Sequence, residues 1–263
     1  MKNIMMINKN NDIIIRYKDL LKGSNNEYVA TDDINTISLA YKYGIEIEEF
    51  FYCSEIEYHE DTSKLIHDLT SYSKNVSVIS KKTYGSLANK DNSVGLFGII
   101  EINNNGFDKI KDKEFLVVCD GLEIPGNLGT IYRTMDSANV QGCIITNLVT
   151  HPFTNKNTVA SRGCNLLVPT WIDSFDNVSS FLINNGYDIY LGEPIEGKCY
   201  KDYDYKGKIA IVVGNERFGI DDRWYKIDSD KIKKVFIPMY GSNNSLNVAV
   251  AASILIYEAK LSR

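Results

Sequence analysis

The stretch IPMYGSNNSLNVAVAASILIYEAK, residues 237–260, joins three unlike pieces of chain. It leaves an apolar run, crosses a polar turn at residues 241–245, and enters an alanine-rich segment that is apolar on nearly every helical face. Ser245 is well placed as the N-cap of that helix. A cap at Ser245 does not explain Asn247 in the first turn, since a buried asparagine costs free energy unless partners satisfy it. The pair therefore indicates a site.

Upstream of this stretch, short apolar runs alternate with helical patterns. The runs are FLVVC (115–119), GCIIT (142–146), YDIYLG (187–192), KIAIVVG (208–214) and KKVFIP (233–238). Fully apolar strands separated by helices predict a parallel sheet that is covered on both faces. In such sheets, ligands bind where loops leave the carboxyl ends of the strands.

The first hundred residues have their own α/β pattern. Residues 32–44 begin with aspartate, end with glycine and predict a helix, and the runs 48–53, 76–80 and 94–102 predict strands. Residues 103–114 are polar and without periodicity, as in a linker. We therefore expect a small N-terminal α/β domain at residues 1–105 and a parallel-sheet α/β domain at residues 106–263.

Composition limits the class of protein. The chain has 263 residues and a net charge of −5, so its overall field repels phosphate weakly. Its five cysteines and three histidines form no CxxC pair and no cluster, which argues against a disulfide scaffold and a metal site. No leader and no run long enough to span a membrane is evident. These features indicate a soluble cytoplasmic protein.

Charge is unevenly distributed in the N-terminal part. Residues 26–68 hold eleven acidic residues and two lysines, whereas residues 69–90 hold four lysines and no acid. Such blocks indicate a basic edge separate from an acidic face, although solvated surface is the simpler interpretation of any single block. The basic edge would comprise Arg16, Lys18, Lys22, Lys74, Lys81 and Lys82, with residues 46–61 facing away from it.

Two further loops carry unusual residues. Residues 120–142 contain Pro125, Gly126 and Gly129 before a helix with Arg133, without the spacing of a dinucleotide fingerprint or a P-loop. Small residues there allow a close approach to a ligand, but a tight turn beside an exposed arginine explains them equally well. In residues 209–220, Glu216 lies between glycines, where it could accept a hydrogen bond from a ligand or cap the next helix.

Together the three loops resemble a known family. P-x-N-x-G-x-x-x-R from Pro125, G-x-E-x-x-G from Gly214 and IPM-x-G-x-x-x-SLNV-x-x-A from Ile237 match, in order and spacing, the three motifs of the SpoU/TrmH RNA ribose 2′-O-methyltransferases of the SPOUT class. The resemblance covers roughly residues 115–260. It implies a C-terminal trefoil knot, a homodimer formed through the knotted domain, and an N-terminal domain similar to a ribosomal-protein fold that binds RNA.

The resemblance also implies a cofactor and site residues. S-adenosylmethionine would be bound, without a metal, by Leu191, Gly192, Glu193, Gly214, Asn215, Glu216, Ile237, Met239, Ser245 and Leu246, with the segment 191–194 lining the cofactor. Arg133 matches the catalytic arginine, and Asn127, Glu216, Ser245 and Asn247 match the other catalytic positions. Because a guanidinium stays protonated, Arg133 is better suited to hold a phosphate or polarise the ribose hydroxyl than to remove a proton.

One departure from the family pattern affects RNA binding. Val159 stands where the family often has an arginine, and Arg162 lies three residues later and could reach phosphate in its place. The extra N-terminal domain favours ribosomal RNA over transfer RNA as the substrate. The alternatives are a relative that binds RNA or cofactor without catalysis, a tRNA 2′-O-methyltransferase, and an α/β enzyme with another nucleotide ligand.

Overall fold

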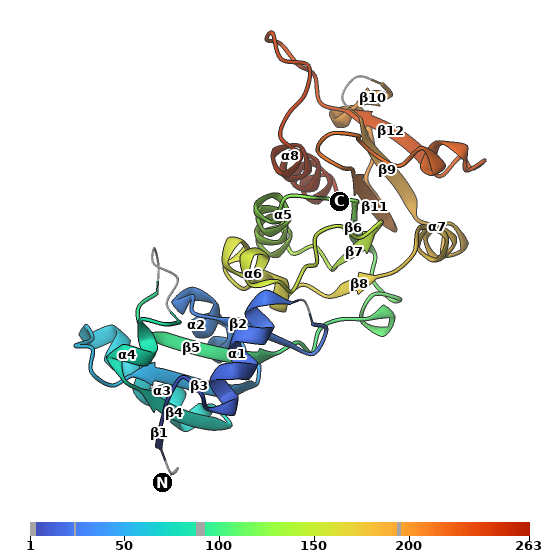
Figure 1. The fold of residues 1–263 in the computed structure, drawn as a ribbon. Coiled ribbons are helices and arrows are strands. Elements are labelled where there is room, and N and C mark those ends of the chain that lie inside the picture. Colours follow the sequence, from blue (N-terminus) through green and yellow to red (C-terminus); the bar gives the residue numbers. More distant parts are fainter. Residues whose placement is uncertain (1–3, 24, 88–92, 194–195) are drawn as a thin grey trace. The chain divides into compact units, whose positions relative to one another are not determined.

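The computed structural model describes residues 4–23, 25–87, 93–193 and 196–263, and the chain separates into two compact units (Figure 1). The first unit comprises residues up to 103 together with 153–166, and the second comprises 104–152 and 167–263. The break after residue 103 falls at the expected linker. The segment 153–166, which we expected in the C-terminal domain, instead belongs to the first unit. Pro194, in the predicted cofactor segment, lies outside the described residues.

The first unit is a mixed sheet with helices. Its strands are β1 (Met5–Ile7), β2 (Tyr28–Thr31), β3 (Ile47–Cys53), β4 (Asn75–Ile79) and β5 (Leu96–Glu101). Its helices are α1 (Asp12–Lys22), α2 (Ile34–Lys42), α3 (Glu60–Tyr72), α4 (Lys81–Tyr84) and α6 (Asn155–Ser161), and Cys164–Leu166 forms a 3₁₀ turn. The strand order is β1-β4-β3-β5-β2, in which β5 runs antiparallel to β3 and β2.

An aromatic cluster forms much of this unit's core. Tyr17 of α1 packs edge-on against Phe51 of β3 and Phe97 of β5, with ring centroids 5.2 and 5.6 Å apart. Phe51 and Phe97 stack at 5.0 Å. Such offset and edge-on aromatic contacts stabilise a core beyond the area that they bury. Helix α6 packs against β2, and this contact explains why the segment 153–166 joins the first unit.

The second unit is a larger α/β layer structure. Its strands are β6 (Phe115–Asp120), β7 (Gly142–Thr146), β8 (Thr170–Ile172), β9 (Asp188–Glu193), β10 (Lys198–Cys199), β11 (Ile209–Val213) and β12 (Ile232–Phe236). Its helices are α5 (Pro125–Ser137), α7 (Phe175–Asn184) and α8 (Val248–Leu261). Short 3₁₀ turns of this unit lie at Phe107–Lys109, Tyr200–Asp202 and Asp222–Lys226.

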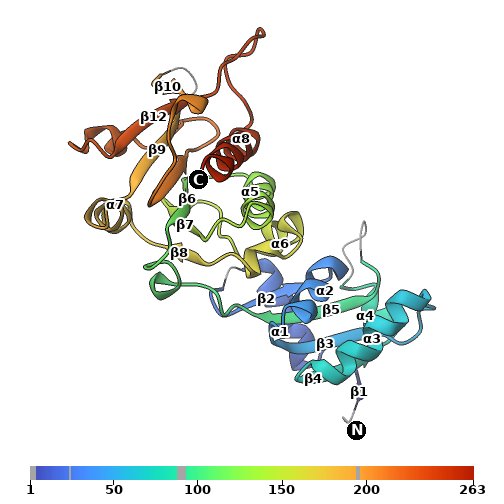
Figure 2. The same ribbon diagram turned by 180° about the vertical axis from the view of Figure 1, so that it is seen from behind.

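The sheet of the second unit is parallel throughout. The strand order is β10-β12-β9-β11-β6-β7-β8, and each neighbouring pair runs in the same direction. Helices α5 and α8 lie on one side of the sheet and α7 on the other, as both views show (Figures 1 and 2). The predicted parallel sheet with two covered faces is therefore confirmed. The trefoil knot that the resemblance implies stays a prediction.

Candidate active site

A cavity of about 520 Å³ opens beyond the carboxyl ends of β9, β11 and β12. The cavity is lined by nine of the residues predicted to hold a cofactor: Gly192, Glu193, Gly214, Asn215, Glu216, Ile237, Met239, Ser245 and Leu246. The tenth, Leu191, is fully buried in the core of the unit and does not line it. The sequence did not predict the apolar residues that line the cavity, which include Val213, Val235 and Leu255. Apolar residues in a cavity wall cannot be told from ordinary core residues by sequence.

Gly214 allows the chain to turn sharply at the end of β11. A Cβ atom at this position would lie 2.3 Å from the backbone atoms of Gly219 and from the amide nitrogen of Ile220. Real Cβ atoms do not approach backbone so closely, so only glycine fits here. The glycine of the second motif thus keeps the strand end close to the returning loop at the wall of the cavity.

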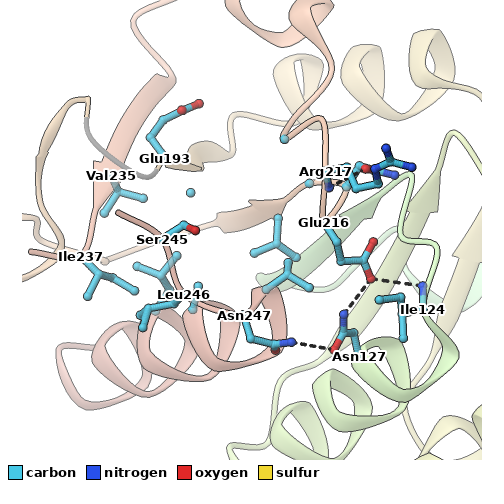
Figure 3. Close-up of a pocket in the computed structure, with 18 of the residues that line it drawn as sticks. Ile124, Asn127, Glu193, Glu216, Arg217, Val235, Ile237, Ser245, Leu246 and Asn247 are labelled. Carbon is cyan, nitrogen blue, oxygen red and sulfur yellow. Dashed lines mark hydrogen bonds between the residues drawn. The ribbon is translucent and has the colours of Figure 1, made fainter. Parts of the chain in front are cut away.

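A chain of hydrogen bonds, here called the Glu216 network, closes one side of the cavity (Figure 3). Asn247 donates from Nδ2 to Oδ1 of Asn127 at 3.0 Å, and Asn127 donates from Nδ2 to Oε1 of Glu216 at 2.8 Å. The carboxylate of Glu216 also accepts the backbone amides of Glu123, at 3.0 Å, and Ile124, at 3.1 Å. Each of the three sequence motifs contributes one side chain to this network.

The network places a carboxylate at the start of helix α5. The helix begins after Ile124 without a side-chain cap, and Glu216 reaches from a distant loop to the amides of Ile124 and of Glu123 just before the helix. A negative charge is favoured there by the helix dipole. Burial raises the pKa of Glu216, but the hydrogen bonds from Glu123, Asn127 and Ile124 outweigh it, so the net pKa is lowered. Glu216 therefore fixes the residues that lead into α5 and does not cap the helix that follows it in the sequence.

The N-cap of α8 differs from the prediction. Asn247, rather than Ser245, caps the helix, with Oδ1 accepting the amides of Ala249 at 2.9 Å and Val250 at 3.4 Å. Asn247 is exposed in the isolated chain rather than buried. The oxygen of its side-chain amide caps α8, and the nitrogen donates to Asn127. Ser245 lines the cavity two residues before the cap.

Arg133 is on the same helix as Asn127 but does not line the cavity. Six residues of α-helix turn the chain by about 600°, so the two side chains point about 120° apart. Arg133 is exposed and has no hydrogen-bond or ion-pair partner among residues 4–23, 25–87, 93–193 and 196–263. The structure therefore unites Asn127, Glu216 and Asn247 but leaves Arg133 available to an external anion.

Glu193 faces the cavity from the opposite side to Glu216 (Figure 3). The hydroxyl of Tyr225 donates to its carboxylate. Burial raises the pKa of Glu193, and the nearby charge of Lys234 opposes that shift only in part. The cavity thus has a half-buried carboxylate at one end, which suits a ligand that carries positive charge or hydrogen-bond donors.

A second set of contacts at the same sheet edge, here called the Asp120 network, has no counterpart in the predictions. Asp120 is 2% exposed and accepts the amide of Asp221 at 2.9 Å, Nε1 of Trp224 at 3.2 Å and Nδ2 of Asn147 at 2.6 Å. Arg223 donates to Asn147 at 2.8 Å. Burial raises the pKa of Asp120, and these donors reduce the rise without cancelling it.

The predicted separation of charge in the first unit is wrong in part. Arg16 forms an ion pair with Glu48 at 2.7 Å, and Lys74 lies 3.6 Å from Glu46. Both acids belong to residues 46–61, which we expected to face away from the basic edge. Strands β3 and β4 pair side by side, which brings Lys74 beside Glu46, and Arg16 reaches Glu48 of β3 from helix α1.

The other basic residues predicted to contact RNA are more accessible. Lys22, Lys81, Lys82 and Arg162 are exposed, and Lys18 is half-buried. Arg162 ends helix α6 in the left-handed conformation, with φ of 53°. Lys81 and Lys82 open the short helix α4.

Metal-binding clusters and membrane-spanning helices are both absent from the described residues. Those residues contain no group of three or more side chains that could together hold a metal ion. No helix within the described ranges has the length and apolar character needed to cross a membrane.

Fold and site together define an α/β protein of the parallel-sheet type, with a small-molecule cavity at the carboxyl edge of its strands. More specifically, the chain belongs to the SpoU rRNA Methylase family, whose model matches residues 114–257.

Curated relatives match the same part of the chain. The 23S rRNA (guanosine(2553)-2′-O)-methyltransferase RlmP of Bacillus subtilis (strain 168) is 29% identical over 154 residues, which are 58% of this chain and 60% of that protein. A Staphylococcus haemolyticus (strain JCSC1435) protein assigned to the TrmH family of tRNA/rRNA methyltransferases is 38% identical over 152 residues, which are 56% of this chain and 60% of that protein. The chain thus matches less than two thirds of these relatives' length.

Solved structures resemble nearly the whole chain. The SpoU methyltransferase AviRb from Streptomyces viridochromogenes, in complex with the cofactor AdoMet, has a TM-score of 0.79 and 23% identity, covering 95% of this chain and 98% of that chain. An AdoMet-bound rRNA methyltransferase from Sinorhizobium meliloti has a TM-score of 0.81 and 22% identity, covering 97% of each chain. At these identities the likeness establishes the fold of both units.

Proposed function

We propose that this chain is an S-adenosylmethionine-dependent RNA ribose 2′-O-methyltransferase that acts on ribosomal RNA. The observation that carries the proposal is the Glu216 network, which joins Asn127, Glu216 and Asn247 across the three family motifs and closes the cavity. Family membership and the name of the Bacillus relative support a ribosomal RNA substrate. A tRNA substrate is the alternative within the same reaction.

The cavity fits S-adenosylmethionine in size and chemistry. Its volume of about 520 Å³ lies within the range of small-molecule sites, roughly 300–1,000 Å³. Val213, Val235 and Leu255 offer apolar contact to a flat base. Gly214 lines the cavity, where its backbone is proposed to bind the cofactor, and Glu193 offers negative charge to a cationic ligand.

When bound, the cofactor supplies a methyl group that is already activated on a sulfonium. The protein's task is then mainly to position the ribose oxygen in line with that methyl group. Arg133 holds the phosphate beside the acceptor ribose or polarises the 2′-hydroxyl. The guanidinium cannot take the hydroxyl proton, so the proton must pass to another acceptor, for which we propose the neighbouring phosphate.

Calorimetric titration of the full chain with S-adenosylmethionine in EDTA tests cofactor binding, and transfer of a labelled methyl group to unmodified 23S ribosomal RNA tests the reaction.

Arg133→Ala should leave cofactor affinity within a few-fold and abolish transfer, and Arg133→Lys should rescue poorly because an ammonium cannot form the forked pair. If S-adenosylmethionine binds but no methyl group is transferred to any RNA, the protein is an inactive relative. If the methyl group is transferred to tRNA alone, the substrate is tRNA rather than ribosomal RNA. Absence of binding would refute the proposal.

The first unit is proposed to bind RNA through its exposed lysines. Lys81→Ala with Lys82→Ala should weaken binding of 23S ribosomal RNA, and each phosphate that is no longer neutralised should lower the salt slope by about one unit. Lys42→Ala, an exposed lysine outside the predicted edge, is the matched control. An unchanged affinity and slope in the double variant would show that the lysines are solvated surface only.

We also propose that the protein forms a homodimer and is located in the cytoplasm. Val250, Tyr257 and Leu261 are 47%, 44% and 80% exposed on α8 and are spaced to lie on one face of the helix. An apolar helical stripe of this kind is typical of a subunit interface. Tyr257→Asp should convert the protein to monomers in sedimentation, and a monomeric wild-type chain would contradict the dimer.

A further inference from the structure

Phe218 is a large apolar side chain held at the mouth of the cavity. It is 77% exposed, while its neighbours Arg217 and Gly219 both line the cavity. An exposed phenylalanine alone is common on protein surfaces. Its place between two cavity-lining residues makes this one a candidate contact for whatever reaches the cavity from solvent.

The turn that carries Phe218 is fixed by hydrogen bonds. Asn215 and Gly219 exchange backbone hydrogen bonds at 2.8 and 3.0 Å. The side-chain oxygen of Asn215 accepts the amides of Arg217 at 2.9 Å and Phe218 at 3.1 Å. Its nitrogen donates to the carbonyl of Gly121 at 2.8 Å, which ties the turn to the loop before α5. The ring is thus presented on a braced support, so binding to it loses little backbone entropy.

A cation accompanies the ring. The guanidinium carbon of Arg217 lies 5.5 Å from the centre of the Phe218 ring. In the close-up, Arg217 lies on the Glu216 side of the cavity, opposite Glu193 (Figure 3). A ring face and a neighbouring guanidinium complement the two parts of a nucleotide, since a base stacks on an aromatic ring and a phosphate binds arginine.

We propose that Phe218 stacks on the base of the nucleotide whose ribose enters the cavity, with Arg217 beside that nucleotide's phosphate. The inference rests on the proposed function and names the contact by which the acceptor nucleotide is held. A ring with a guanidinium beside it suits a base and its phosphate better than an apolar protein surface, which offers no group for the cation to bind.

Kinetics with unmodified 23S ribosomal RNA test this contact. Phe218→Ala should raise the KM for RNA roughly 5- to 150-fold, the range found for loss of one base–aromatic stack, with cofactor affinity unchanged. Phe218→Tyr should stay near the wild type, because the ring face is retained. Phe218→Leu, which keeps the apolar bulk, should behave like Phe218→Ala. If Leu is as good as Phe, or if Ala has no effect, the stacking proposal is wrong.

A fluorescence measurement separates this inference from the proposed reaction. The native tryptophans Trp171 and Trp224 are 7% and 0% exposed, so Phe218→Trp adds one solvent-exposed indole. Unmodified 23S ribosomal RNA should quench that indole, even if no methyl group is transferred. If RNA binds without quenching the indole, the inference is wrong. It is also wrong if the indole is quenched in the absence of RNA as the protein concentration rises, because a second chain would then cover the ring.

Discussion

The Glu216 and Asp120 networks join loops at the same edge of one sheet, yet their carboxylates differ. Glu216 accepts two backbone amides and Asn127 beside an open cavity, and its pKa is lowered. Asp120 accepts three donors in the interior, and burial leaves its pKa raised. A similar number of hydrogen bonds therefore leads to opposite pKa shifts, because the two sites differ in access to solvent. We infer that the Asp120 network holds the fold and the Glu216 network shapes the cavity.

The largest expected effect comes from breaking the buried network. Asp120→Ala removes the carboxylate that faces three donors and should lower the free energy of unfolding by about 3 kcal/mol or more. Urea denaturation followed by circular dichroism measures this change. Asp202→Ala, at an exposed position, should stay within about 0.5 kcal/mol of the wild type. A decrease no larger than that of the control would show that the Asp120 network does not hold the fold.

A change in the Glu216 network should lower cofactor affinity more than it lowers the free energy of unfolding. Glu216→Gln places an NH₂ group against other donors, at a cost of about 1–3 kcal/mol. The affinity for S-adenosylmethionine should fall roughly 5- to 150-fold, while the free energy of unfolding falls less than in Asp120→Ala. Calorimetry checks the affinity, with Glu55→Gln as an exposed control. Unchanged affinity in Glu216→Gln would remove the distinction between the two networks.

A smaller effect is expected at the other end of the Glu216 network. Asn247→Ser retains an oxygen that can cap α8 but removes the donor to Asn127, at a cost of about 1 kcal/mol. Cofactor affinity should fall about fivefold.

In thermal unfolding, Asn247→Ala should destabilise the protein more than Ser245→Ala, because Asn247 caps the helix and Ser245 does not. The reverse order would restore Ser245 as the cap.

The smallest expected effect is a pH dependence of opposite sign in the two networks. Glu216 has a lowered folded-state pKa, so its contribution to stability is present above its unfolded pKa and is lost as the pH falls through its folded pKa. Asp120 has a raised folded-state pKa, so its protonation on acidification favours the fold. Relative to Asp120→Asn, the wild type should gain stability as the pH falls through that raised pKa. Carboxyl NMR titration should show Asp120 taking up its proton before Glu216, and the opposite order would contradict this comparison.

The central strands could be predicted and the outer ones could not. The strands β6, β7 and β11 lie within apolar runs, because strands covered on both faces need apolar side chains. Strands β9 and β12 carry charged residues beside their apolar ones, and their apolar residues were enough to predict them. Strands β8 and β10 have three and two residues, too few for a pattern. The place of the segment 153–166 with the first unit depends on packing against β2, to which no local signal points.

The candidate site was predictable in its members but less so in their roles. Glu216 could be interpreted as a ligand contact or a cap of the next helix. In the structure it binds the amides of Glu123 and Ile124 at the start of a helix that begins 91 residues earlier, which no local pattern can reveal. Ser245 and Asn247 are both good caps by type. Asn247 caps α8 because it immediately precedes the helix and its Oδ1 accepts first-turn amides, while its nitrogen donates to Asn127. The Asp120 network was not predicted because an aspartate at a strand end is common in turns.

The spacing of the Glu216 network along the chain also bears on how the protein is made. Asn127 meets Glu216 and Asn247, which follow it by 89 and 120 residues. At about 5–20 residues per second, a ribosome needs about 6–24 seconds to add the later of these partners. During that interval Asn127 and the start of α5 are on the nascent chain without these partners. The Glu216 network can therefore form only after most of the second unit has been synthesised.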